Sequence, residues 1–363
     1  MDNIHPEHKE LCCILIVEAL RKLQRDLWRT KAGQPILPPR TVNGVGGEQF
    51  VACMGMLKDK EWIDFGASGT VFRTDLSIPP KSSNGIANDL IQKYPGFEPL
   101  THLIQRTGNR LAEFWTGKAN GARVLFEKAE GKKLTEQVYN IDNTSKAFYG
   151  LMKHFLEPIV RYYSERMLRL GSSRRPLHDE MHILELGAGT GGTATWLMPL
   201  LEKYVPQGWA RYHCADISDS LVVHAMQRFY HRTNFMHFFR LHMEGPLVDV
   251  LGKQDIVIVS NALHATANTV QTLRNIRQYL RPEGGIALIL EIVEKECCWT
   301  DFIYGFSDGW WQFDDSRVEA LQNEEEWKQD FFFTAGFTDV KYTRGSSRDS
   351  RFQKLFLASM LPK

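Results

Sequence analysis

A histidine and a glutamate stand where a proton-transfer site could form. His264 follows the apolar run 254–260, and Glu291 lies near the end of the apolar run 286–292. A carboxylate that binds an imidazole fixes its tautomer and stabilises the protonated ring, so the histidine becomes a better general base. The alternative is that His264 only caps the helix that follows and that Glu291 is only a solvated residue at a strand end.

A run of glycines is the second feature that could do chemistry. The segment 183–192 reads ILELGAGTGG, and a helical pattern follows it at 193–204. Because glycine accepts positive φ angles and has no Cβ, such a strand-to-helix turn lets backbone N–H groups and a helix N-terminus approach a ligand. We therefore expect a cofactor cradle, with a turn that serves only tight packing as the alternative.

The spacing of the glycines fits two cofactors. Gly187, Gly189 and Gly192 match the dinucleotide pattern G-x-G-x-x-G. Glu185 followed by glycines at alternate positions matches the pattern of S-adenosylmethionine (SAM) enzymes. Asp216 ends the next predicted strand, about 25 residues beyond the turn, where an acidic side chain commonly binds the ribose hydroxyls. These residues support an adenosine-containing cofactor and fit either NAD or SAM.

The elements that position these residues decide between the two cofactors. From residue 181 onward predicted strands and helices alternate, which implies a parallel, doubly wound sheet with its ligand at the carboxyl ends of the strands. The last two predicted strands, 338–343 and 353–360, form a closing antiparallel hairpin. This is the layout of class I SAM-dependent methyltransferases, and dinucleotide dehydrogenases do not end this way. We therefore predict an α/β fold with a Rossmann-like sheet of the class I SAM-dependent methyltransferase type.

The sequence patterns before this sheet predict a mostly helical, winged-helix-like N-terminal domain. Helical patterns at 10–27 and 48–62 lead into a turn and a short β element at 65–73, and further helical patterns follow. Neither of the first two helices carries a stripe of Lys or Arg, so we expect them to pack against protein rather than DNA.

A long aromatic helix is predicted at 145–170, before the linker 171–176. A helix of this kind next to a cofactor domain is suited to roof the pocket, so we place the domain boundary before the helix and not at the linker. Residues 1–139 are then the helical domain on the substrate side, and residues 140–363 are the SAM-binding domain.

Composition excludes several classes of function. The chain has 363 residues, 43% of them hydrophobic, which is enough for two folded domains. A net charge of +1 gives no electrostatic reason to expect nucleic acid or a membrane as partner. The apolar runs are too short to span a bilayer, and the N-terminal residues do not form a signal peptide. The six cysteines and the histidines match no zinc or disulfide pattern, so we expect reduced thiols, a cytoplasmic location and no metal.

Several motifs together resemble one protein family. They are ILELGAGTGGT, SNALHAT, LRPEGG, GWWQFDD and AGFTDV, and in the N-terminal part EHKELCCILIVEALRKL, GTVFRTD and IPPKSSN. They look like the C-methyltransferase domain embedded in fungal non-reducing polyketide synthases, over nearly the whole chain. The resemblance implies methyl transfer from SAM to the α-carbon of a β-ketoacyl chain, which an acyl carrier protein holds as a phosphopantetheine thioester. It also implies a His264–Glu291 dyad, S-adenosylhomocysteine as product, and the other domains of the same synthase as partners.

The layout of such domains assigns roles to further residues. The cofactor residues are Glu185 near the base of the turn, Gly187, Gly189 and Gly191 along the methionine portion of SAM, Asp216 on the ribose, and Met243 and Glu244 beside adenine. Four aromatic residues are candidate walls for the polyketide chain, namely Tyr149, Trp310, Trp311 and Phe313. The alternative for each aromatic residue is a place in the core.

Two other functions remain open at this point. A free-standing O-methyltransferase could use the same histidine and carboxylate to deprotonate a phenol. A SAM-binding module without catalysis could serve as a structural spacer, although the intact glycines, Asp216, His264 and Glu291 argue against such decay.

Overall fold

The computed structural model describes residues 4–38, 45–121, 123–127, 129–140, 143–170, 180–232, 235–251, 253–295, 297–345 and 351–360. The linker predicted at 171–176 lies outside these residues. Among the described helices, none is long and apolar enough to cross a membrane.

The chain forms two compact units. The first unit comprises Met1–Asn143 and Glu296–Trp311, and the second comprises Thr144–Lys295 and Gln312–Lys363. The functional boundary between residues 139 and 140 stays a prediction. The sequence had given no indication that a later segment, Glu296–Trp311, returns to the first unit.

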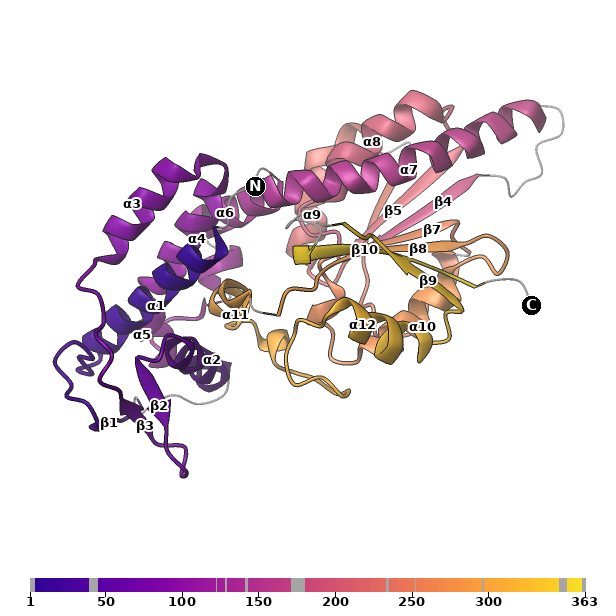
Figure 1. The fold of residues 1–363 in the computed structure, drawn as a ribbon. Coiled ribbons are helices and arrows are strands. Elements are labelled where there is room, and N and C mark those ends of the chain that lie inside the picture. The colour runs from indigo at the N-terminus through magenta and orange to yellow at the C-terminus, as the bar shows by residue number, and fades with distance from the viewer. Residues whose placement is uncertain are drawn as a thin grey trace. The chain divides into compact units, whose positions relative to one another are not determined.

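The first unit is mostly helical (Figure 1). Its helices are α1 (His5–Lys22), α2 (Val45–Asp59), α3 (Ser83–Lys93), α4 (Glu98–Gly108), α5 (Leu111–Trp115), α6 (Ala129–Asn140) and α11 (Cys298–Tyr304). A small antiparallel sheet has the order β1-β3-β2, formed by Pro35–Ile36, Val71–Arg73 and Ile63–Phe65. Helix α4 ends at Gly108, a poor helix former, and the short helix α5 follows it.

One buried side chain explains why α11 belongs to the first unit. Gln49 of α2 donates to the carbonyl of Phe302 in α11 at 3.2 Å and accepts the indole N–H of Trp115 at 2.6 Å. A buried amide is stable only when its polar atoms are hydrogen-bonded, so this pairing ties three helices to one another.

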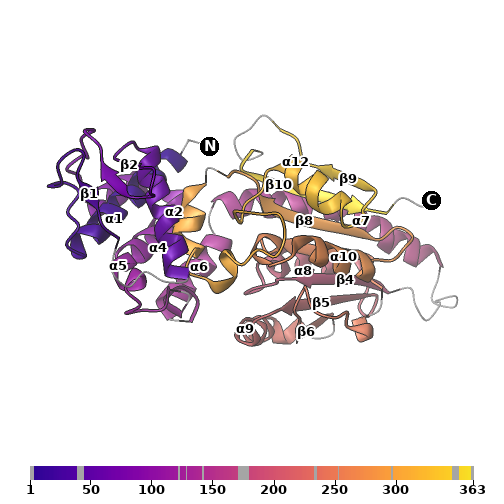
Figure 2. The same ribbon diagram turned by 90° about the horizontal axis from the view of Figure 1, so that it is seen from below.

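The second unit contains a seven-stranded sheet in the order β6-β5-β4-β7-β8-β10-β9, which Figure 2 shows from below. The strands are β4 (Met181–Leu186), β5 (Ala210–Asp216), β6 (Met236–Arg240), β7 (Ile256–Ser260), β8 (Ile286–Ile292), β9 (Asp339–Tyr342) and β10 (Gln353–Ser359). The pairs among β4 to β8 are parallel, whereas β10 is antiparallel to both β8 and β9. The predicted fold class, a parallel sheet closed by an antiparallel hairpin, is confirmed.

Helices cover both faces of this sheet. Figure 1 shows α7 (Asn143–Leu170) and α8 (Gly192–Tyr204) above it, and α10 (Thr269–Tyr279) and α12 (Glu324–Glu326) below it. Helix α9 (Asp219–Phe229) connects β5 to β6. Because both faces are covered, β7 and β8 are almost entirely buried and read as continuous apolar runs. The order of connections reverses between β4 and β7, and ligands of such sheets bind where this reversal occurs.

Candidate active site

The glycine turn joins β4 to α8 with three left-handed residues. Gly187, Gly189 and Gly191 have φ angles of +69°, +55° and +82°. A Cβ on Gly187 would lie 2.5 Å from Ala262 Cβ, and one on Gly191 would lie 2.6 Å from the ring of Phe229, so these two glycines permit tight packing. A Cβ on Gly189 would meet nothing within 4 Å. The middle glycine therefore faces open space, and its backbone fits a cradle that a cofactor approaches closely.

Asp216 at the end of β5 is bound to this turn. One carboxylate oxygen accepts the backbone N–H of Gly189 at 2.9 Å, and the other accepts that of Ser218 at 2.9 Å. Burial raises the pKa of Asp216, and these backbone N–H groups oppose the rise. The two oxygens together have about four acceptor sites, so the carboxylate keeps capacity for a ligand hydroxyl.

Glu185 lies inside the sheet, below the turn. Its buried carboxyl accepts a hydrogen bond from the phenol of Tyr212 on β5. Burial raises its pKa to about 7, against the hydrogen bonds from Thr193 and Tyr212. Glu185 thus connects β4 to β5 and to the start of α8, and its predicted contact with the cofactor stays a prediction.

Met243 and Glu244 follow β6 and differ in their contacts. The methyl carbon of Met243 lies 3.6 Å from the Cβ position of Gly187, so Met243 adjoins the glycine turn. The two carboxylate oxygens of Glu244 accept the backbone N–H groups of Asn268 at 2.6 Å and Ala267 at 3.2 Å. Glu244 therefore holds the loop after His264, while the predicted adenine contacts of both residues stay a prediction.

The structure brings His264 and Glu291 together. His264 lies in a short 3-10 helix, η6 (Leu263–Ala265), after β7, and Glu291 lies in the neighbouring strand β8. Glu291 Oε2 is 2.7 Å from His264 Nδ1, and Oε1 accepts the backbone N–H groups of Leu263 at 2.8 Å and Ala262 at 3.1 Å. Both side chains are buried.

This arrangement fixes the tautomer of the neutral imidazole. A carboxylate only accepts hydrogen bonds, so the contact with Glu291 places the proton on Nδ1 and the lone pair on Nε2. The N-cap of α10 is Asn268, whose side chain accepts the N–H of Gln271 at 2.9 Å. His264 thus does not cap that helix, and its geometry suits proton transfer at Nε2.

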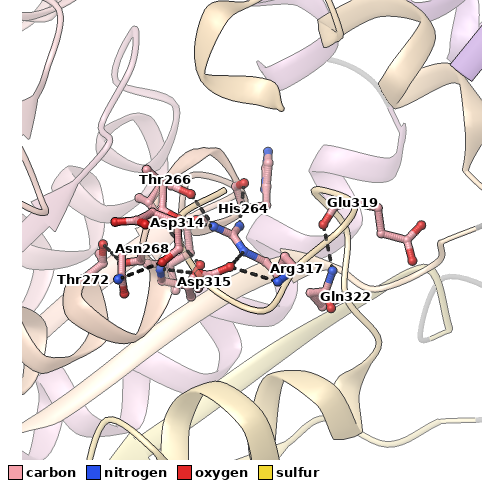
Figure 3. A network of polar contacts seen from close by, with 12 residues as sticks. His264, Thr266, Asn268, Thr272, Asp314, Asp315, Arg317, Glu319 and Gln322 are labelled. Atoms are coloured by element: carbon pink, nitrogen blue, oxygen red, sulfur yellow. Dashed lines mark hydrogen bonds and ion pairs between the residues drawn. The ribbon is translucent and has the colours of Figure 1, made fainter. Parts of the chain in front are cut away.

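Sequence reasoning missed a second group that holds this loop, shown in Figure 3. The buried guanidinium of Arg317 donates to the backbone carbonyls of His264, Thr266 and Ala267 and pairs with Asp315. Burial alone would raise the pKa of Asp315, but the hydrogen bonds from Arg317 and from the backbone N–H of Thr269 outweigh burial and lower it. The polar segment that contains Arg317 has no local pattern that points to His264, 53 residues away in the sequence.

The four predicted aromatic walls divide between the two units. Tyr149 on α7 is half-buried with its ring centroid 6.3 Å from that of Trp196, and Phe313 lies 4.7 Å beneath the guanidinium of Arg317. In the first unit, Trp310 is buried and donates to Asp301 at 2.9 Å, and Trp311 donates to the Gly305 carbonyl at 2.8 Å. Their role as substrate walls stays a prediction. In the described part of the chain, no three His, Cys, Asp or Glu side chains form a group that could hold a metal ion.

The chain is similar to known methyltransferases in sequence and in structure. Residues 184–286 match the methyltransferase domain family. The solved structure of the citrinin polyketide synthase CMeT domain is similar with a TM-score of 0.89 and 30% identity, covering 99% of this chain and 91% of that one. The trans-methyltransferase CalH, solved in complex with S-adenosylhomocysteine (SAH), has a TM-score of 0.66 and 20% identity over 99% of this chain and 93% of its own, and so shares the fold.

A curated relative extends far beyond this chain. The non-reducing polyketide synthase pigA of Monascus ruber is 34% identical over 369 residues, which cover 99% of this chain and 13% of that protein. The chain therefore spans 13% of the length of that relative.

Proposed function

Since the chain belongs to the family of polyketide synthase C-methyltransferase (CMeT) domains, which are SAM-dependent, we propose that it methylates the α-carbon of a β-ketoacyl thioester. An α-carbon between two carbonyls is a poor nucleophile until it loses a proton. The reaction therefore needs a base and a site that holds this carbon in line with the methyl group to be transferred.

The contact between His264 and Glu291 beside the glycine turn supports this proposal most directly. Ala262, two residues before His264, packs against Gly187 of the turn, so the imidazole and the proposed cofactor site belong to one region of the second unit. Glu291 keeps the proton on Nδ1 and leaves Nε2 to remove the α-proton. The carboxylate then stabilises the imidazolium that forms.

The residues at the glycine turn fit SAM as cofactor. The open backbone at Gly189 would lie along the methionine portion, Asp216 would bind the ribose hydroxyls, and Met243 would lie near adenine. When bound, SAM supplies an electrophilic methyl group, and the chain's own residues orient the two reactants and move the proton. The SAH complex of CalH, a protein with the same fold, supports this assignment.

We assign the acyl chain to a phosphopantetheine thioester on an acyl carrier protein. Curated relatives are polyketide synthases, and this chain matches 13% of their length, so other domains of such a synthase would provide the carrier and build the polyketide. Tyr149 and Phe313 of the second unit are the proposed contacts for that chain.

The test is a methyl-transfer assay with the purified chain, SAM and a short β-ketoacyl pantetheine thioester. We expect a new methyl group on the α-carbon, located by mass spectrometry and NMR, and its loss in His264→Ala. Deuterium exchange of the α-proton in D2O without SAM measures the base separately, and it should also require His264. His237→Ala, which removes an exposed histidine of β6, is the matched control.

The other outcomes of this assay identify the alternatives. When the assay is repeated with a phenol as the acceptor, methyl transfer only to the phenolic oxygen would identify an O-methyltransferase. SAM binding without transfer to any carbon or oxygen acceptor would identify a module without catalysis.

A further inference from the structure

Arg317 is a buried cation whose hydrogen bonds converge on the backbone around His264. Its Nη1 donates to the His264 carbonyl at 3.0 Å, and its Nη2 donates to the carbonyls of Thr266 and of Ala267, the latter at 3.2 Å. Its Nε donates to Asp315 at 2.8 Å. We propose that Arg317, oriented by Asp315, is a positioning residue that fixes the direction of the His264 imidazole toward the substrate.

The need for such a residue follows from the shape of the loop. Helix η6 has three residues, too few to satisfy its own terminal carbonyl groups. The planar guanidinium carries five N–H donors in a rigid fork, and here it binds three carbonyls and one carboxylate at once. Lysine, with three donors on a flexible stem, cannot reproduce this pattern.

The loop is thereby held on both of its polar sides. Glu291 and Glu244 accept its backbone N–H groups at residues 262, 263, 267 and 268, while Arg317 binds its carbonyl groups. Residues 314–315 join the His264 loop further, because Asp314 donates its N–H to the Ala267 carbonyl at 2.8 Å and Asp315 accepts the N–H of Thr269 at 2.9 Å. Without the hydrogen bonds from Arg317 to these carbonyl groups, the backbone at His264 could rotate away while Glu291 stays in place.

The effect of Arg317 is geometric and not one of net charge. Asp315 neutralises the guanidinium at 2.8 Å, so the pair exerts only a weak field on the imidazole. The ring centroid of Phe313 lies 4.7 Å from the guanidinium carbon, and the ring stabilises the cation on one face. Substitutions should therefore change the position of His264 more than its electrostatic surroundings.

The experiment compares Arg317→Lys with Arg281→Lys. Arg281 also pairs with a buried aspartate, Asp255, at 2.9 Å, but it follows α10 before the start of β8 and does not contact the His264 loop. We expect Arg317→Lys to lower kcat about 100-fold, because a displacement near 1 Å costs roughly that factor. The Kd for SAM should stay within about twofold, and Arg281→Lys should leave kcat unchanged.

A spectroscopic readout separates positioning from general structure. In protein with 15N-labelled histidine, the Nδ1 proton of His264 in its hydrogen bond to Glu291 should give a downfield resonance that Arg317→Lys shifts or broadens. Asp315→Asn, which keeps the guanidinium but removes the carboxylate that orients it, should change the resonance and kcat in the same direction by less. If Arg317→Lys does not fold, the result for Asp315→Asn decides.

This inference relies on the proposed function only in treating His264 as the base. If His264→Ala still transfers the methyl group, the proposed function fails. The resonance of the wild type and of Arg317→Lys still reports whether Arg317 orients the imidazole. A folded Arg317→Lys with an unchanged resonance and kcat within twofold of the wild type would overturn the inference.

Discussion

Strands β4 and β7 are neighbours in the same sheet, and the segments that follow them are built in opposite ways. The turn after β4 is shaped by the positive φ angles of three glycines. The loop after β7 is held by side chains that arrive from elsewhere, Glu244, Glu291 and Arg317. In the proposed function, the first region thus presents backbone to the cofactor, whereas the second directs the imidazole of His264. Changes that add a Cβ should harm the first region, and changes that keep shape but alter donors and acceptors should harm the second.

Glu291→Gln should have the largest effect and sharpen this contrast. The amide keeps the size of the side chain but has one accepting oxygen, while the carboxylate accepts from His264 and from two backbone N–H groups. We expect kcat for methyl transfer to fall about 1,000-fold, within the usual range for a disabled general base. The Kd for SAM, measured by calorimetry, should stay within about twofold. A large loss of SAM affinity would show that the two regions are not separable.

A second buried histidine, His213 of β5, leads to a prediction about how the stability of the fold depends on pH. Burial lowers the pKa of His213 to about 4, with the nearby His237 and His182 adding to the effect. The unfolded chain then binds more protons between pH 6.5 and pH 4, so the free energy of unfolding should fall across that window as pH falls.

Urea unfolding at several pH values measures this loss, which we expect to be on the order of 2–3 kcal/mol for His213. The variant His213→Gln should flatten the pH dependence between pH 6.5 and pH 4. An equal pH dependence in the variant would mean that other groups, such as His8, whose pKa burial lowers to about 3, carry the effect.

The smallest expected effect comes from Gly189→Ala, compared with Gly208→Ala. Both glycines have positive φ angles, +55° and +77°, and a Cβ on either would meet nothing within 4 Å. Each variant should lose about 1 kcal/mol of stability, because an L-residue is strained in this conformation. Only Gly189→Ala should also raise the Kd for SAM, by about tenfold, since its methyl group would enter the cofactor space. Equal Kd values for SAM in the two variants would contradict the proposed position of SAM beside Gly189.

Much of the fold was predictable because its determinants are local. Gly187, Gly189 and Gly191 are required by positive φ angles at three nearby positions, and a strand that is buried on both faces must be apolar throughout. The hairpin of β9 and β10 was also predictable, because a polar turn separates its two strand-like segments. By contrast, nothing local indicated that Glu296–Trp311 belongs to the first unit, because that placement depends on partners such as Gln49.

The candidate site was predictable only in part. His264 and Glu291 could be named because each follows or ends an apolar run, and a family resemblance joined them. Arg317 gave no comparable pattern, since its hydrogen bonds go to carbonyl groups about 50 residues earlier in the chain.

By itself the sequence determined the class of fold, the glycine turn and the residue types at the strand ends, since these follow from backbone preferences and from the period of apolar residues. Tertiary structure decided which of these residues meet. The parallel register pairs Ser260 with Leu290, which sets Glu291 beside the start of the His264 loop. The return of the chain after α11 then brings Arg317 to the carbonyl side of that loop. Hydrogen bonds act over about 3 Å, so contacts between residues distant in sequence exist only once the sheet and its loops are in place.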